Sequence, residues 1–128
     1  MSIILHIARR KAWDEYSAER YYSDPSLTTE GFIHCSTVRQ AIDTLNRHFP
    51  DKLDLVFLCI DEQKLEPKVI YESPKGITID DARIKEVYPH LYGPINMTAV
   101  IRVVDLVPES DGSFQLPEEI NQLSDKYR

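Results

Sequence analysis

The sequence predicts an α+β domain with a mixed, largely antiparallel sheet of roughly five or six strands, two early helices and a C-terminal helix. Three observations support this class. Apolar strand-like runs cluster after residue 55 with no long helix between them, which favours antiparallel pairing. Helical periodicity is confined to 10–20 and 38–49, with a further helix start at Pro117. The 128 residues suffice for a single domain, 1–128, with its own core.

The N-terminal third alternates between strand, helix and loop signals. Residues 3–8 form a short apolar run that predicts the first strand. In the helical segment 10–20, Trp13 and Tyr16 fall on one face and are expected to point inward. Residues 23–31 are rich in turn formers, so we expect a loop there.

The next segment combines a strand with a well-marked helix. Residues 32–35 are expected to form a strand. Thr37 and Gln40 have the spacing of a capping box, in which the two residues satisfy free N–H groups of a helix start. The helix should cover 38–49 and end at Pro50.

The second half reads mainly as strands. Residues 55–60 are apolar without alternation, which predicts a central strand buried on both faces. Further strands are expected at 69–72 and 99–106. Residues 73–89 show a weak pattern and should form a long loop with a short strand near 77–79.

Composition excludes several classes of protein. Acidic residues outnumber basic ones by 21 to 15, and the net charge of −6 argues against a nucleic-acid partner. No apolar run approaches the ~20 residues that cross a bilayer, and the N-terminus lacks the features of a signal peptide. We therefore expect a cytoplasmic protein that does not bind membranes. In that setting Cys35 and Cys59 should be reduced thiols.

A histidine within ordered structure marks the first candidate site. Because alternate residues of a strand share a face, Phe32, His34 and Ser36 should point to one side. A histidine beside a hydroxyl on one strand face is typical of a lined binding cleft. The alternative is a packed histidine that donates to a backbone carbonyl, with Ser36 acting as a helix cap.

Two further histidines are candidates for the same cleft. His6 lies in the first strand and would face His34 if the two strands are neighbours. His90 and Tyr92 precede the turn signal Gly93–Pro94 and are expected at the rim. Imidazole nitrogens can donate to or accept from a sugar hydroxyl near neutral pH. A purely structural role remains the alternative for each histidine.

Other chemistries fit the pattern less well. A zinc site built from His6, His34, Cys35 and His90 conflicts with strand alternation, and no pair has the usual ligand spacing, so we expect no metal. Cys35 as a nucleophile conflicts with its expected inward direction. The four glycines are scattered singly, which argues against a phosphate-binding loop.

The histidine motifs carry a family resemblance over nearly the whole chain. The segments Glu30–Ser36 and His90–Ile95, with His6 in the first strand and Trp13 in the first helix, resemble the bacterial domain of unknown function 952 family. The resemblance implies an ADP-ribosyltransferase-like fold and an NAD ligand. It implies that His6 contacts a ribose, and that His34 and Ser36 line the nicotinamide end.

The sequence departs from the pattern of active transferases in one respect. Such enzymes use a late glutamate to steady charge at the ribose, whereas the region after Gly93–Pro94 supplies only Asn96 before Asp105. Glu72 is the candidate substitute. The resemblance therefore gives His34, Ser36 and Glu72 as candidate catalytic residues. The candidate NAD-binding residues are His6, His90, Tyr92 and Asn96.

The expected function is that of a histidine-lined cleft that binds NAD or a related nucleotide-ribose ligand. The alternative is a non-catalytic module of the same fold that binds another small metabolite or a protein partner. The missing glutamate favours the alternative, so the sequence leaves open whether the protein is an enzyme. It contains no signal for an oligomeric state.

Overall fold

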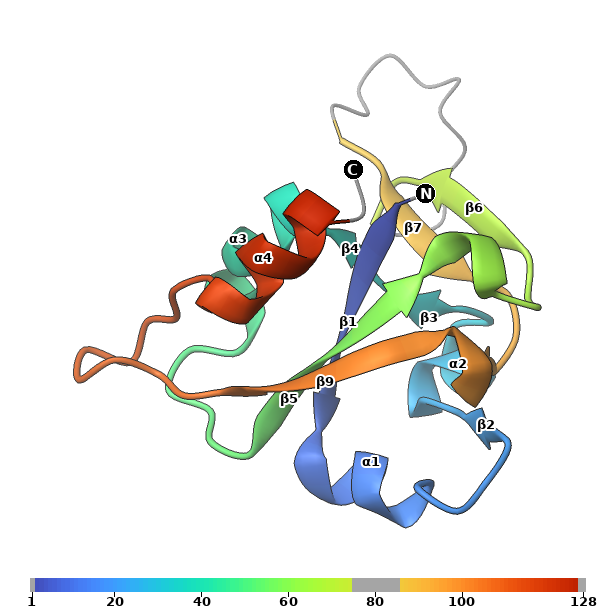
Figure 1. Ribbon diagram of the computed structural model, residues 1–128, viewed down its shortest axis with the longest axis horizontal. Coiled ribbons are helices and arrows are strands. Elements are labelled where there is room, and N and C mark those ends of the chain that lie inside the picture. The colour runs from blue at the N-terminus through green and yellow to red at the C-terminus, as the bar shows by residue number, and fades with distance from the viewer. Residues whose placement is uncertain (1, 75–85, 127–128) are drawn as a thin grey trace.

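The centre of the protein is a four-stranded antiparallel sheet (Figure 1). The computed structural model describes residues 2–74 and 86–126. The strand order is β4–β1–β5–β9. The bounds are β1 Ile3–Arg9, β4 Ser36–Thr37, β5 Leu55–Asp61 and β9 Val100–Leu106.

Strand β5 is the buried middle of this sheet, as predicted from its unbroken apolar run. All seven of its residues are buried. It pairs with β1 along its whole length, from Ile3 opposite Asp61 to Arg9 opposite Leu55. Since neighbouring residues of a strand point to opposite faces, β5 supplies apolar side chains to both layers that cover the sheet.

Two helices cover one face of the central sheet (Figure 1). They are α3, Val38–His48, and α4, Glu118–Lys126. Leu45 of α3 and Ile120 of α4 are fully buried against Phe57 of β5. The predicted helix start is confirmed, because the backbone N–H of Thr37 donates to the Gln40 side chain at 3.1 Å. Residues 38–49 and the helix start near 117 were therefore predicted to within one residue.

Two smaller sheets cover the opposite face of the central sheet. The sequence had predicted one continuous sheet of five or six strands for the whole protein. Strand β2 pairs with β8, and β7 lies between β3 and β6. All strand pairs within the described residues are antiparallel. The bounds are β2 Tyr21–Tyr22, β3 Ile33–His34, β6 Val69–Glu72, β7 Tyr88–Leu91 and β8 Ile95–Asn96. The α+β class is confirmed, and the single sheet is wrong because several strands are only two residues long.

The first helix is shorter than the 10–20 expected. Helix α1 covers Arg10–Glu15 only. The backbone N–H groups of Tyr16 and Ser17 then bond to carbonyls three residues back, at 3.0 and 3.2 Å, which tightens the chain into a turn. This turn lets Trp13 and Tyr16 pack around Tyr22, with ring centroids 5.7 and 5.1 Å away.

The expected loop 23–31 contains a short helix, α2, Pro25–Thr29. The Asp24 side chain accepts a hydrogen bond from the backbone N–H of Ser26 at 2.9 Å, which is an N-cap. Pro25 follows at the first helical position, where its missing N–H costs nothing. Two short 3₁₀ helices, η1 Glu62–Lys64 and η2 Met97–Ala99, complete the elements. The strand expected near 77–79 lies outside the described residues.

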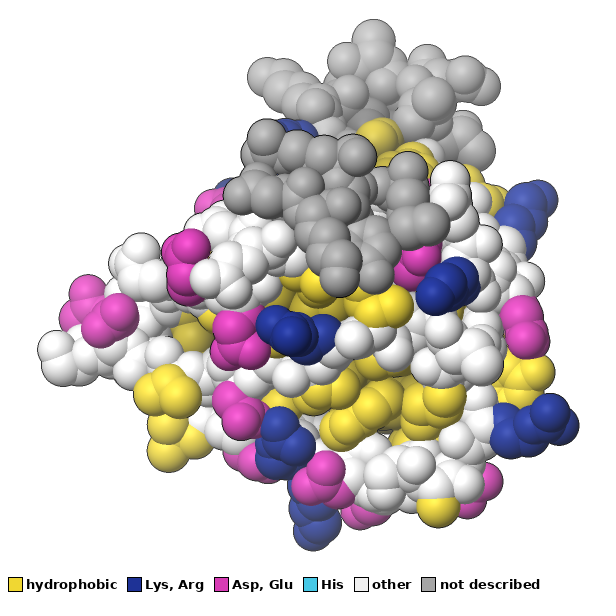
Figure 2. Space-filling model, viewed as in Figure 1, with side chains coloured by type: hydrophobic (Ala, Val, Ile, Leu, Met, Phe, Trp, Pro, Cys, Tyr) yellow, Lys and Arg dark blue, Asp and Glu magenta, His cyan; other side chains and the backbone are white. Residues whose placement is uncertain are grey.

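The face shown in Figure 2 is apolar around β9. Hydrophobic side chains gather beside this edge strand, charged side chains surround them, and no histidine is visible. Two ion pairs flank the strand: Arg10 with Asp105, and Arg102 with Glu119. None of the described helices is both long and apolar enough to cross a membrane.

Truncation of a helix residue buried against β5 tests this core. Leu45 is fully buried, and Leu45→Ala should lower the free energy of unfolding by about 3 kcal/mol because it leaves a cavity. Leu53→Ala is the matched control, because Leu53 is 75% exposed and its loss should change stability by no more than about 0.5 kcal/mol. Urea unfolding monitored by circular dichroism measures both, and equal effects would contradict the assigned core.

Candidate functional site

The predicted strand 32–35 is broken at Cys35, where the chain passes from one sheet to another. His34 in β3 pairs with His90 in β7, whereas Ser36 in β4 pairs with Leu5 in β1. The backbone N–H of Cys35 donates to the carbonyl of Pro89 at 3.0 Å, which holds the crossing point. His34 and Ser36 are therefore two residues apart but belong to different sheets, so the single strand was wrong.

A cavity of about 410 Å³ lies beside this crossing point. Its volume falls within the range of small-molecule sites. Strand β4 pairs with β1 only at Ile4 and Leu5, and the cavity begins where that pairing ends. One wall carries His6, Asp24, His34, Ser36, Tyr88 and His90. The facing wall is helix α3, with Asp43, Thr44, Arg47 and His48.

His6 connects the central sheet to this wall. Its imidazole is buried, and Nδ1 donates to the carbonyl oxygen of His34 at 2.7 Å. Its Nε2 lies 3.4 Å from Oδ2 of Asp24, an ion-pair contact, and makes no hydrogen bond within the described chain. Both ring nitrogens thus face oxygen acceptors.

Asp24 is ionised beside His6. Burial alone raises the pKa of its carboxyl, but the contact with His6 and the backbone hydrogen bond from Ser26 outweigh burial. Together they hold the pKa of Asp24 well below its ordinary value. One carboxylate therefore caps α2 and supplies a negative charge at the cavity wall.

His34 is more exposed than His6 and His90. Its side chain is 45% exposed, and Nε2 lies 3.1 Å from both carboxylate oxygens of Glu30. Its ring meets that of His90 edge-on, with centroids 5.1 Å apart. As predicted from alternation, Phe32 shares this face and contacts the His34 ring at a centroid distance of 4.9 Å.

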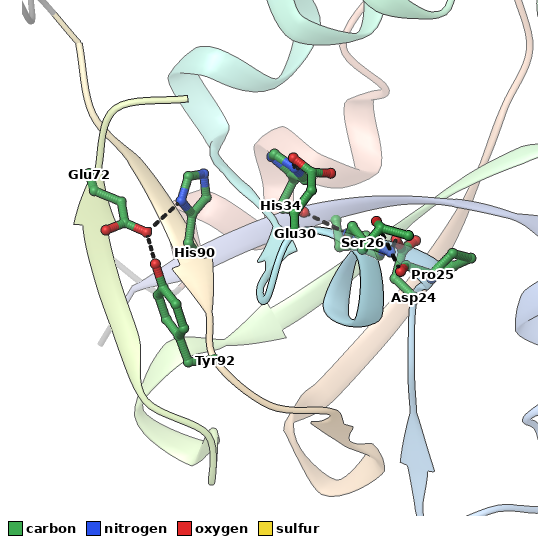
Figure 3. Close-up of polar contacts among 10 residues, drawn as sticks. Asp24, Pro25, Ser26, Glu30, His34, Glu72, His90 and Tyr92 are labelled. Atoms are coloured by element: carbon green, nitrogen blue, oxygen red, sulfur yellow. Dashed lines mark hydrogen bonds and ion pairs between the residues drawn. The ribbon is translucent and has the colours of Figure 1, made fainter. Parts of the chain in front are cut away.

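His90 is held by a buried carboxylate (Figure 3). Its Nδ1 donates to Oε1 of Glu72 at 2.9 Å, and the Tyr92 hydroxyl donates to the same oxygen. The ring of Phe32 stacks on the imidazole with centroids 4.0 Å apart and planes at 16°. These contacts fix both the orientation of the ring and the position of its proton.

The fixed proton leaves the other nitrogen of His90 as an acceptor. Burial lowers the pKa of His90 and outweighs the opposing effect of Glu72, so the ring is neutral at pH 7. With its proton on Nδ1, the ring carries a lone pair on Nε2. That atom is buried and has no hydrogen-bond partner in the part of the chain that the structure describes. Burial and the bond to Glu72 also raise the pKa of Tyr92 to about 12.

The structure brings together only some of the candidate residues. His6, His34, Ser36 and His90 all line the cavity. Glu72 and Tyr92 lie behind His90 and contact it, directly or through the shared carboxylate, without lining the cavity wall.

Asn96 lies apart from the cavity wall. Its amide nitrogen donates to the carbonyl of Lys64 and the hydroxyl of Thr98, and its amide oxygen accepts from the N–H of Glu66. These bonds use the amide to join η1 to η2. The structure therefore does not bring Asn96, a candidate NAD-binding residue, together with the histidines of the cavity.

Two carboxylates of the site were missed in the sequence. Asp24 read as a turn former, although its place before Pro25 and Ser26 is typical of an N-cap. Glu30 read as part of a loop, although it precedes His34 by four residues. The facing wall from α3 had no sequence signal, because Thr44 and Arg47 resemble an ordinary solvated helix face.

Cys35 and Cys59 are both buried free thiols. Burial raises the pKa of both, that of Cys59 to about 12, so neither is a thiolate at neutral pH. Among the described residues, no group of three or more histidine, cysteine or acidic side chains could hold a metal ion.

The fold and cavity define an α+β protein in which strands of two antiparallel sheets and helix α3 line a cavity that contains histidines. The chain belongs to the family described as "Protein of unknown function (DUF952)", whose family model matches residues 7–103, and the resemblance noted from the histidine motifs is confirmed. Two similar solved structures are of CC0527 from Caulobacter crescentus. Its crystal structure is 30% identical, covers 94% of this chain and 99% of that chain, and has a TM-score of 0.76. Its solution NMR structure is 29% identical, covers 93% and 97%, and has a TM-score of 0.75. No curated protein matches the chain.

The contact between Asp24 and His6 predicts an acid-dependent loss of stability. Because the folded-state pKa of Asp24 lies below its value of about 3.9 in the unfolded chain, the ionised carboxylate stabilises the fold above about pH 4. Asp24→Asn should therefore be less stable than the wild type at pH 6, and the difference should shrink as the pH falls below about 4. Urea unfolding across this range measures it. A difference independent of pH would show that the charge of Asp24 plays no part.

Proposed function

We propose that the cavity binds a nucleotide-ribose ligand, with NAD and ADP-ribose as the two candidates. The proposal rests on one observation: His90 lines the cavity and has a buried Nε2 acceptor with no partner in the described chain. Buried polar atoms are nearly always satisfied, and a ligand hydroxyl is a donor that would satisfy this one. A ribose supplies such hydroxyl groups.

The neighbouring groups support a sugar ligand. His6 and Asp24 offer a donor and an acceptor on one side, and the half-exposed imidazole of His34 lies between them and His90. Ser36 adds a hydroxyl to the same wall. Polar groups of both kinds within a small volume match the alternating donor and acceptor character of a ribose.

The facing wall has a cation for the phosphate groups of such a ligand. Arg47 borders the cavity and is held by Asp43 on the same helix at 2.9 Å. Arginine pairs readily with phosphate oxygens. The ADP-ribosyltransferase-like fold that the motif resemblance implies is part of this proposal, since it gives the positions of His6, His34 and Ser36 a common ligand.

Transfer of ADP-ribose from NAD has less support than binding. A transferase needs a carboxylate to steady the charge at the anomeric carbon, and Glu72 was the candidate for that role. In the structure its Oε1 accepts from both His90 and Tyr92 and is buried. The geometry therefore gives Glu72 the role of orienting His90. A non-catalytic binding module is the second candidate function, and this engagement of Glu72 favours it.

Calorimetric titration with NAD and ADP-ribose tests the proposal. We expect saturable binding of at least one ligand, weakened about tenfold in His90→Gln because the acceptor nitrogen is lost. Glutamine retains an amide donor for Glu72, so the buried carboxylate keeps a partner.

Arg39→Gln is the control for this experiment. Arg39 lies on α3 but outside the cavity wall and pairs with Glu86 on the surface, so binding should be unchanged. Thermal unfolding of each variant separates a loss of binding from a loss of fold. Absence of binding heat for both ligands with the folded wild type would refute the proposed function.

A further inference from the structure

We propose that the cavity is a hydrolase site that removes ADP-ribose from an oxygen-linked acceptor, with His90 as general base and His6 as general acid. This inference rests on the proposed binding of ADP-ribose and adds a reaction to it. It goes in the opposite direction to transfer from NAD, because the substrate is an O-glycoside of ADP-ribose and the second substrate is water.

The two histidines have opposite hydrogen-bonding states within one cavity wall. Glu72 holds the proton of His90 on Nδ1, which leaves Nε2 as an acceptor. The carbonyl of His34 and the carboxylate of Asp24 both face His6, which makes its Nε2 a donor. A donor and an acceptor in one cavity wall are the two groups that general acid–base catalysis needs.

Nε2 of His90 is unpaired in the described chain, and Nε2 of His6 has only the 3.4 Å contact with Asp24, without a hydrogen bond. Both atoms are buried, both residues line the cavity, and neither atom has a hydrogen-bond partner in the described chain. His34 separates them: its carbonyl accepts from His6, and its ring contacts that of His90. His34 therefore lies between the acid and the base along the cavity lining.

The balance of the reaction follows from these positions. The water oxygen bonds to the anomeric carbon of the ribose while its proton passes to Nε2 of His90. The bond from that carbon to the acceptor oxygen breaks, and this oxygen takes the proton from Nε2 of His6. The products are free ADP-ribose and the acceptor alcohol. His90 then releases its proton to solvent and His6 regains one.

The presence of a general acid, His6, determines which leaving group the site favours. Nicotinamide leaves NAD as a neutral base and needs no proton. A proton donor such as His6 would therefore have no role in that cleavage. An alcohol leaving group needs one. The ionised carboxylate of Asp24 places negative charge beside His6, where it also favours the positive charge that develops on the sugar.

Two synthetic substrates with different leaving groups test the assignment. They are the 1″-O-methyl and 1″-O-(4-nitrophenyl) glycosides of ADP-ribose, and release of ADP-ribose is followed by chromatography. The wild type should hydrolyse both. The amide nitrogen of asparagine can take the place of Nδ1 and donate to the His34 carbonyl. His6→Asn should therefore slow the methyl glycoside at least about 100-fold but leave the nitrophenyl glycoside within a few-fold, because nitrophenolate leaves without a proton. His90→Gln should slow both.

The controls separate this inference from the proposed function. Arg39→Gln, outside the cavity wall, should hydrolyse both substrates at the wild-type rate. If His6→Asn does not fold, Asp24→Asn keeps the imidazole and should slow the methyl glycoside more than the nitrophenyl one. Binding of ADP-ribose by a wild type that hydrolyses neither glycoside would overturn the hydrolase and leave the binding proposal standing. Equal slowing of both glycosides in His6→Asn and in Asp24→Asn would overturn the acid role of His6. Failure to bind ADP-ribose would overturn the hydrolase, and only failure to bind both ADP-ribose and NAD would also overturn the proposed function.

Discussion

The hydrogen bond from Nδ1 of His6 to the carbonyl of His34 is the contact on which the cavity depends. Strand β4 pairs with β1 over only two residues, so it cannot by itself hold β3 against the central sheet. The buried imidazole supplies a rigid link at the point where that pairing ends. Without it the backbone carbonyl of His34 would lose its donor, and β3 would no longer fix where the His34 and His90 rings lie.

Three of the four histidines around the cavity, His6, His34 and His90, each contact a carboxylate, but the three pairs differ physically. Glu72 and His90 are both buried, so their hydrogen bond acts in a weakly screened environment and orients the ring firmly. Asp24 is one-quarter exposed and contacts His6 without an aligned hydrogen bond. Glu30 and His34 are both about half exposed, and such a pair contributes little to stability. The order of burial is thus also the order in which the rings are fixed.

The parts of the fold that were predicted are those with strong periodicity or capping signals. The unbroken apolar run of β5 and the capped helix α3 were found almost to the residue. The break at Cys35 was not, because strands of two residues have no period to detect. For the same reason the sequence could place Phe32 and His34 on one face but could not show that Ser36 belongs to another sheet.

The site residues that lie on strands were predicted from the sequence. Those whose surroundings depend on residues distant in the sequence were missed. His6, His34, Ser36 and His90 were expected to meet, and all four line one cavity. Asn96 was named because it follows Gly93–Pro94. Its amide oxygen and nitrogen instead bond to Glu66 and Lys64, which lie about 30 residues earlier in the chain. Glu72 was expected to stabilise positive charge on the sugar. One carboxylate cannot both orient His90 and stabilise charge on a sugar on the far side of that ring. In the structure Glu72 is bonded to His90, and the carboxylates that line the cavity are Asp24, beside His6, and Asp43 of α3. The carboxylate nearest to His6 is thus carried by the start of α2, whereas the one that orients His90 is carried by β6.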